Sequence, residues 1–324
     1  MRILRVALVP ILAFLASASA QELPRADAVR IREFYRLATE VQDKVWPRWS
    51  EIPAPLLLVT DKAEFLIHHP APPKDFKKIT EDIYIRPRQF PTNLLATFPA
   101  FGPPSVIVIG EAENTSSKTS TPWLITLMHE HFHQLQNAQP GYFQAVEALA
   151  LSHGDKSGMW MLNYPFPYDK PEVTQAFMRA RDLLLDVLNE SDEHKFAKLV
   201  VEYVAQRKGF FAQLSPDDQK YLAFQLWQEG IARYTQIKVA ESAAQYQPST
   251  EYAALPDFES LGAYASHARK DTLGELRKAD LRKSKREVVY AWGAAERLLL
   301  DQIRPGWRDE YFKHPFSLDS YFDK

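Results

Sequence analysis

The sequence predicts an α+β fold in which a small mixed β-sheet comes first and a mainly helical region follows. Short segments rich in β-branched residues and bounded by Pro or Gly all lie before residue 111, whereas apolar residues beyond residue 121 recur at helical spacing. Prolines also cluster before the helical region and become rare after Pro171. We therefore expect three parts: an N-terminal segment 1–20, a helix with a small sheet at 21–120, and a helical region at 121–324.

The N-terminal segment has the pattern of a secretory signal. Arg2 and Arg5 precede an apolar run at 6–15, and alternating Ala and Ser residues end at Ala20. An uncleaved anchor is the alternative, but this run is shorter than the roughly 20 residues of a membrane-spanning helix. We expect a protein that begins at Gln21, is periplasmic or secreted, and has no membrane span after signal removal.

Composition excludes several classes of protein. The chain has no cysteine, so neither disulfides nor a lipidated cysteine can anchor or stabilise it. With 39 basic and 41 acidic side chains it lacks the strongly basic balance of a nucleic-acid-binding protein. Without disulfides, stability must come from a packed core, and 46% apolar residues are enough for one large domain or two tightly packed lobes. The sequence does not indicate an oligomeric state.

The first part begins with an amphipathic helix at about 25–45, followed by strands at 54–60, 82–86 and 105–109. We expect the last of these strands to form the sheet edge beside a cleft, where an extended peptide could pair. The loop 163–171 either marks a boundary, lines a cleft or is a rigid surface connection. Helical spacing predicts helices near 122–137, 141–152, 172–189, 193–212, 216–243, 257–278 and 285–302.

The helix at 122–137 carries the motif HExxH at residues 129–133. Residues four apart share one helix face, so His129 and His133 can bind one metal ion. Glu130 is positioned to reach a water on that metal, which makes it the candidate general base. His131 lies on another face and is expected to meet solvent or packing. The alternative is that the histidines are merely hydrogen-bonded on a half-buried helix.

The start of this helix supports the motif. Ser120 and Thr121 supply N-cap chemistry, and Pro122 suits the first turn. The histidines are therefore expected to lie about two turns inside a real helix rather than in a loop.

A catalytic zinc site requires a third protein ligand. Three residues compete for this position: Glu147, His153 and Glu229. We favour Glu229, because it interrupts an apolar helical face and is followed by Gly230, where a second helix could approach closely. The alternative is a structural ion pair between Glu229 and Arg233.

Around these residues the sequence resembles the gluzincin metallopeptidases, in which a glutamate on a later helix completes HExxH. The segment Trp227-Gln-Glu-Gly-Ile-Ala-Arg-Tyr234 is similar to the family's glutamate segment, with the Trp shifted by one residue. Glu229 lies much farther along the chain than in the aminopeptidase and thermolysin branches, so the likeness is to divergent peptidase-MA-like gluzincins of bacterial exported proteins. It implies a zincin-like fold, His129, His133 and Glu229 as Zn²⁺ ligands, and Glu130 as base.

The expected activity is hydrolysis of a peptide or protein substrate, and an endopeptidase is favoured. Tyr234, Tyr290 and His267 are candidates to stabilise the oxyanion, although each is also an ordinary packing residue. The segment at 110–114 echoes the aminopeptidase segment that binds a free amino group, but a polar turn explains it better. The remaining alternatives are an exopeptidase, a non-peptidase zinc hydrolase and a non-catalytic binding module of the cell envelope.

Overall fold

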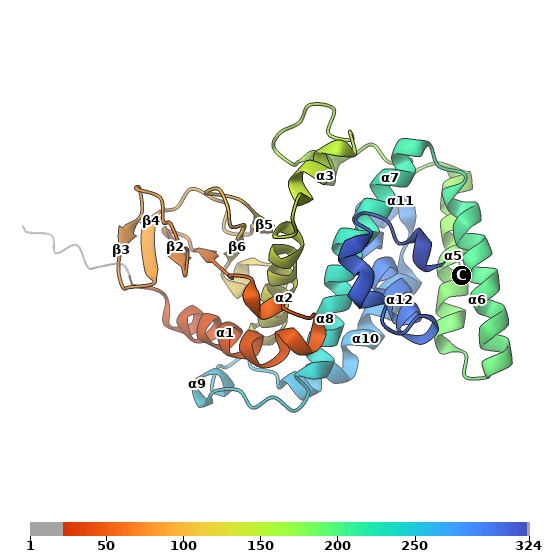
Figure 1. Cartoon of the computed structure of the whole chain (residues 1–324). Coiled ribbons are helices and arrows are strands. Elements are labelled where there is room, and N and C mark those ends of the chain that lie inside the picture. The colour runs from red at the N-terminus through yellow and green to blue at the C-terminus, as the bar shows by residue number, and fades with distance from the viewer. Residues whose placement is uncertain (1–21, 323–324) are drawn as a thin grey trace, which may run out of the picture.

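The protein has a mixed α+β architecture, which confirms the predicted class. The computed structural model describes residues 22–322. The sheet and α1 (Arg25–Val45) form one side of the molecule and α5, α6, α10 and α12 the other, with α2 and α8 between them (Figure 1). The strands are β1 (Leu56–Val59), β2 (Ala63–Ile67), β3 (Lys77–Lys78), β4 (Ile83–Pro87), β5 (Leu95–Phe98) and β6 (Val106–Gly110).

The sheet has six strands in the order β3-β4-β2-β1-β6-β5. β1 and β6 are parallel and every other pair is antiparallel. The three predicted strands are present as β1, β4 and β6. The expectation that 105–109 forms the edge was wrong, because β5 adds to the outer side of β6. β5 spans only four residues, Leu95–Phe98, directly before Pro99, so its sequence carries little strand signal.

The helical part follows the predicted order, with shifted boundaries and several short additional helices. The predicted helix at 141–152 ends at Ala148, and the one at 257–278 begins only at Leu261. The longer helices are α2 (Ser120–Asn137), α3 (Tyr142–Ala148), α5 (Pro171–Asn189), α6 (Glu193–Phe211), α7 (Pro216–Gln225), α8 (Ile231–Ser242), α10 (Leu261–Lys278) and α12 (Val288–Ile303). The short ones are α4 (Trp160–Asn163), α9 (Thr250–Ala253) and α11 (Leu281–Ser284).

The start of α2 is held by a distant residue rather than by its own cap. The helix begins at Ser120, and Thr119 before it makes no side-chain cap bond. Instead, Asp257 in the connection between α9 and α10 accepts bonds from the Ser120 backbone N–H at 2.8 Å and from its hydroxyl at 2.7 Å. A carboxylate at this position also suits the positive end of the helix dipole. The expected local cap was therefore wrong.

The predicted helix at 216–243 is continuous but not regular. A π-helical turn at Leu226–Gly230 joins α7 to α8. At this turn α12 crosses so closely that a Cβ on Gly230 would lie 2.5 Å from the Cα of Gly293. The expected close approach of a second helix at Gly230 is confirmed, and Gly293 serves the same contact.

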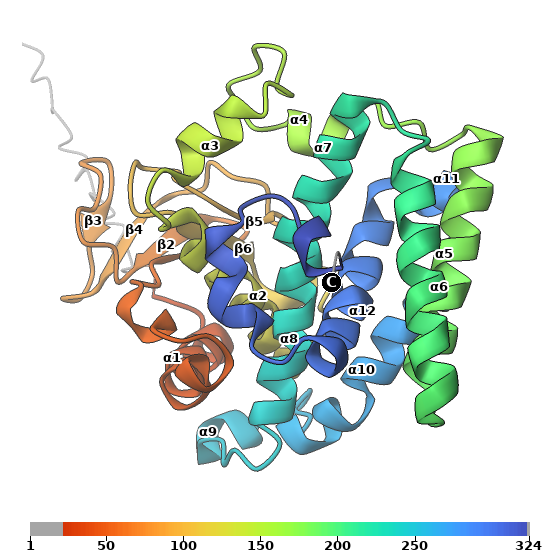
Figure 2. The same cartoon turned by 45° about the vertical axis from the view of Figure 1, so that its right-hand side comes forward.

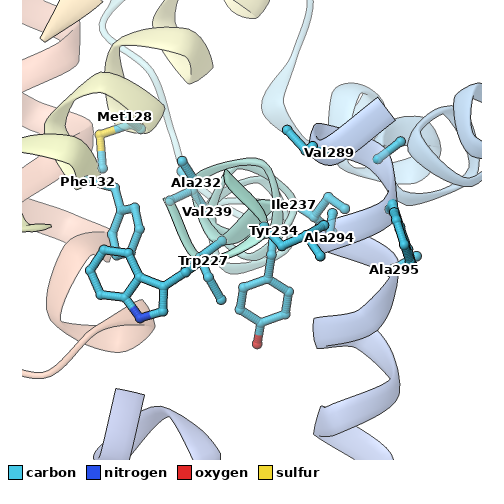
Figure 3. Close-up of a cluster of buried hydrophobic side chains, with 14 of the residues drawn as sticks. Met128, Phe132, Trp227, Ala232, Tyr234, Ile237, Val239, Val289, Ala294 and Ala295 are labelled. Carbon is cyan, nitrogen blue, oxygen red and sulfur yellow. The ribbon is translucent and has the colours of Figure 1, made fainter. Parts of the chain in front are cut away.

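The core lies around α8. Figure 3 shows α8 between α2 and α12, with Met128 and Phe132 of α2 on one side and Val289 and Ala294 of α12 on the other. These side chains are buried. Next to them, α5 pairs with α6 and packs against α12 (Figure 2). The motif helix α2 therefore packs against the sheet on one side and against α8 on the other.

Within 22–322, no helix combines the length and the apolar character needed to cross a bilayer. The predicted signal segment 1–20 lies outside the described residues.

Candidate metal centre

The two motif histidines point to the same place. Their Nε2 atoms are 3.1 Å apart, and each residue is 6% exposed. They lie in the middle of α2, whose flanking apolar residues Met128 and Phe132 are fully buried. The motif thus sits on a rigid helix rather than a loop, as a site that must hold a fixed geometry requires.

Glu229 reaches the histidines from the π-helical turn. Its Oε2 lies 3.6 Å from Nε2 of His129 and 3.3 Å from Nε2 of His133. The wider turn of a π-helix shifts the direction of the side chains that follow it, and such turns occur often at functional sites. By contrast, Glu147 on α3 and His153 in the following loop are exposed. Of the three candidate ligands, Glu229 is the one whose contacts join the histidines.

The spacing of these atoms matches the corners of a metal site. Ligands about 2.05 Å from a tetrahedral zinc ion lie about 3.3 Å from one another. The distances among Nε2 of His129, Nε2 of His133 and Oε2 of Glu229 are 3.1, 3.6 and 3.3 Å. The residues present therefore fit a small divalent cation in both donor type and separation.

The tautomer of His133 also suits a ligand. Gln136 uses its amide nitrogen to donate to the Tyr311 hydroxyl at 2.7 Å and the Gln228 carbonyl at 3.2 Å. Its oxygen therefore faces Nδ1 of His133, 2.6 Å away, and Nδ1 must be the donor. Nε2 of neutral His133 keeps its lone pair toward Glu229 and His129, which is the arrangement that metal-binding histidines share.

The charges at the site favour a cation between these groups. Burial by itself lowers the pKa of His133, but the carboxylates of Glu229 and Glu130 outweigh it and raise the pKa to about 9. Burial likewise raises the pKa of Glu229, but the positive charges of His133 and Arg286 hold it well below its ordinary value. A metal ion would take the place of the proton on His133.

Glu130 is held by a residue that sequence reasoning missed. The hydroxyl of Thr97, on β5, lies 2.7 Å from Oε2 of Glu130 and 3.0 Å from its carbonyl oxygen. Potential ligand atoms of Glu130 and the two histidines lie within 4.8 Å of one another, so this buried group could itself hold a metal ion. Glu229 is nevertheless closer to the histidines, and the Thr97 bond occupies one Glu130 oxygen.

The partner of Glu229 is Arg286, which was also missed. Its Nη2 donates to Oε1 of Glu229 at 2.7 Å. Arg233, the partner considered from the sequence, instead approaches Glu275 at 3.6 Å. Arg286 lies in the short 3-10 turn Lys285–Glu287 before α12, and nothing in its local sequence marks it as part of a site. Only the crossing of α12 over the π-helical turn brings it there.

The three oxyanion candidates lie in different places. The Tyr290 ring faces the His129 ring at 6.1 Å, and its hydroxyl accepts a bond from Nη1 of Arg286 at 3.0 Å. Tyr234 instead extends from α8 on a different side from Met128 of α2 (Figure 3) and donates to Asp301 at 2.9 Å. Tyr234 is thereby bound in the helical core.

His267 on α10 is not at the histidine pair. It bonds to Asp271 at 2.6 Å and Glu259 at 3.0 Å, and these bonds raise its pKa. It lines a separate cavity of about 410 Å³ that also includes Thr126, one turn before the motif.

His131 packs rather than facing solvent. Its ring stacks on Trp49 at 5.0 Å, and its two nitrogens lie 2.9 Å from Gln134 and 3.1 Å from Gln42. Burial lowers its pKa to about 4. Both ring nitrogens are thus occupied by amide groups away from the site.

No protein-family model, curated protein or solved structure matches this chain.

Proposed function

We propose that this protein is a zinc-dependent metallopeptidase with a zincin-type site, in which His129, His133 and Glu229 hold the metal. The observation that carries the proposal is the spacing of 3.1, 3.6 and 3.3 Å among two imidazole nitrogens and one carboxylate oxygen. The assigned tautomer of His133 and the burial of both histidines support it. Zinc is the proposed metal because two imidazoles and one carboxylate, with the histidines in an HExxH helix, are a ligand set of catalytic zinc sites.

Bound zinc would supply a Lewis acid that acidifies water and polarises a carbonyl group. The protein then has to move a proton and orient the substrate. Glu130 is the proposed general base, and the Thr97 bond to its Oε2 fixes the carboxylate while leaving Oε1 free to accept a proton. Glu130 lies close to both histidines but is not one of the three closely spaced ligand groups, His129, His133 and Glu229. This position suits a general base.

Tyr290 is the proposed donor to the developing negative charge on the substrate oxygen. It is the one of the three candidates that faces a motif histidine. Burial raises the pKa of its hydroxyl above the ordinary value of 10, so the group stays protonated and able to donate at neutral pH.

The proposed substrate is a peptide in extended conformation, cut within the chain. β5 is the terminal strand of the sheet on the side of the motif, and its Thr97 touches Glu130. A backbone could pair along such an edge. Recognition of a free amino group has less support, because Glu113 of the 110–114 segment accepts bonds from Arg30 of α1 at 2.7 and 3.2 Å.

Export remains part of the proposal and rests on the basic and apolar pattern of 1–20. Amino-terminal sequencing of the protein from its native host tests it. A chain that begins at or near Gln21 supports export, and retention of Met1 in the cytoplasm contradicts it.

The catalytic proposal is tested with the purified protein and Glu130→Gln. We expect one zinc per chain, hydrolysis of a mixed peptide library, and loss of at least about 100-fold in rate for the variant with zinc retained. Metal bound without any Glu130-dependent hydrolysis would identify a binding module. Cleavage of esters but not peptides would identify another class of hydrolase, and dependence on an unblocked amino terminus would identify an exopeptidase.

A further inference from the structure

Arg286 makes three side-chain hydrogen bonds, two of them to residues of the candidate centre. Its Nη2 donates to Oε1 of Glu229 at 2.7 Å, its Nε to Oε1 of Gln225 at 2.9 Å, and its Nη1 to the hydroxyl of Tyr290 at 3.0 Å. Only 11% of the side chain is exposed. A largely buried guanidinium with three hydrogen-bond partners on different elements is held in one orientation.

We propose that Arg286 is the positioning residue of this centre: it holds Glu229 to the metal through one oxygen and turns the hydroxyl proton of Tyr290 toward the substrate. This inference rests on the proposed function. It assigns a role to a residue that neither the HExxH motif nor the glutamate segment contains.

The first half of the proposal follows from the two oxygens of Glu229. Oε2 faces the histidines at 3.6 and 3.3 Å, whereas Oε1 is engaged by Arg286 at 2.7 Å. A free carboxylate can bind a metal through both oxygens, but a charge-assisted bond to one oxygen competes with that mode. Arg286 would therefore leave only Oε2 of Glu229 to bind the metal, and a small protein ligand set is what a catalytic site requires.

The second half follows from what an arginine can do. A guanidinium has donors and no acceptor. In the bond between Arg286 and Tyr290 the phenol oxygen must therefore accept, and the phenol proton remains available for another partner. Since the Tyr290 ring lies along His129, that partner can be an oxygen of the substrate beside the metal.

The geometry also explains why an arginine is needed. The planar guanidinium of Arg286 donates three hydrogen bonds, one each to α7, the π-helical turn and α12. A lysine ammonium at the end of a flexible stem cannot reproduce that geometry. Arg286→Lys keeps the positive charge beside Glu229 but loses the shared plane. The variant thus distinguishes a role of Arg286 in orienting Glu229 and Tyr290 from a role in only neutralising the Glu229 carboxylate.

The experiment compares wild type with Arg286→Lys, and Arg207→Lys is the matched control. Arg207 on α6 is also buried and bonds a carboxylate, Glu296, at 2.7 Å, but its ion-pair partners Glu296 and Asp319 are not residues of the candidate centre. Metal affinity is measured by competition with a chelator. We expect Arg286→Lys to bind zinc about 10–100-fold more weakly, the usual effect of losing a partner of a metal ligand, and Arg207→Lys to bind it as wild type does.

Two further readouts test the mechanism. In the cobalt-substituted proteins, Arg286→Lys should show the weaker visible absorption of a higher coordination number, because Glu229 is free to bind through both oxygens. In peptide hydrolysis, kcat should fall with little change in KM, and Tyr290→Phe should cost much less in the Arg286→Lys background than in wild type.

The outcomes separate the two proposals. If wild type binds no zinc and cleaves no peptide, the proposed function fails. If wild type does both and Arg286→Lys matches it in affinity, cobalt spectrum and kcat, the role of Arg286 fails alone. Should Arg286→Lys not fold, Gln225→Leu removes the Nε partner and is expected to weaken zinc binding in the same direction. Unchanged affinity in that variant would overturn the proposal.

Discussion

Gly230 of the π-helical turn and Gly293 of α12 meet backbone to backbone. A Cβ on Gly230 would lie 2.5 Å from the Cα of Gly293, and a Cβ on Gly293 would lie 2.4 Å from the Cα of Gly230. Real Cβ atoms do not approach other atoms so closely. This contact sets how deeply α12 sits over the turn, and α12 carries Tyr290 to the candidate metal centre.

We therefore expect Gly293→Ala to separate the two helices and to lower the free energy of unfolding by about 1–3 kcal/mol or more, the usual range for an overpacked core. Metal affinity should fall as well, because Glu229 lies in the π-helical turn and moves when the turn is displaced. Urea denaturation and chelator competition measure the two effects.

Gly274→Ala is the matched control, because Gly274 also lies within a helix but has no atom within 4 Å of an added Cβ. It should raise stability by about 0.5–1 kcal/mol through helix propensity. If Gly293→Ala is tolerated as well as Gly274→Ala, the close contact is not a constraint.

Replacing Glu229 by Gln should remove the charge of the proposed third ligand. We expect zinc affinity to fall by more than the roughly 10–100-fold typical of losing a supporting contact to a metal ligand. We also expect zinc to raise the melting temperature of wild type far more than that of the variant. Isothermal titration and thermal unfolding with and without zinc give both quantities. Glu147→Gln changes an exposed carboxylate and should behave as wild type; the reverse ranking would make Glu147 the ligand.

Thr97 is expected to act through Glu130. Thr97→Val is nearly isosteric and removes the hydroxyl 2.7 Å from Oε2, so the carboxylate loses the contact that orients it. We expect kcat for peptide hydrolysis to fall about 10-fold with KM changed little, whereas Thr97→Ser should restore most of the rate. Equal activity of the Val and Ser variants would assign Thr97 to packing alone.

Glu111 makes stability depend on pH. Burial and the nearby charges of Asp27 and Asp61 raise its pKa to about 7 from the ordinary 4.5. The folded protein thus holds this proton more tightly than the unfolded chain. The resulting stabilisation is fully present below pH 4.5 and is lost as pH rises through 7.

Glu111→Gln should therefore be more stable than wild type at pH 8, by about 1 kcal/mol after allowance for solvent screening, and equal to it near pH 4. Its amide oxygen can still accept the bond that Asn114 donates. Denaturation at both pH values measures the difference, and Glu81→Gln at an exposed position is the control. A difference of equal size at pH 4 and pH 8 would show that ionisation is not its cause.

Sequence patterns within single segments predicted those parts of the fold and site that depend on neighbouring residues. Apolar spacing located α2 with His129 and His133 on one face, because helical periodicity is a property of neighbouring residues. The strand β5 escaped prediction because its four residues gain their conformation from pairing with β6. Likewise, the cap of α2 comes from Asp257, which only folding brings to Ser120.

The sequence alone determined the motif helix, the order of sheet and helices, and the polar interruption at Glu229. The tertiary structure decided which groups meet there: Thr97 at Glu130, and Arg286 and Tyr290 at Glu229 and His129. The physical reason is that these contacts join segments far apart in the chain. They depend on a strand added at the sheet edge and on a crossing of helices. The local sequence indicated a close approach at Gly230, but it indicated neither the added strand nor Gly293 as the partner.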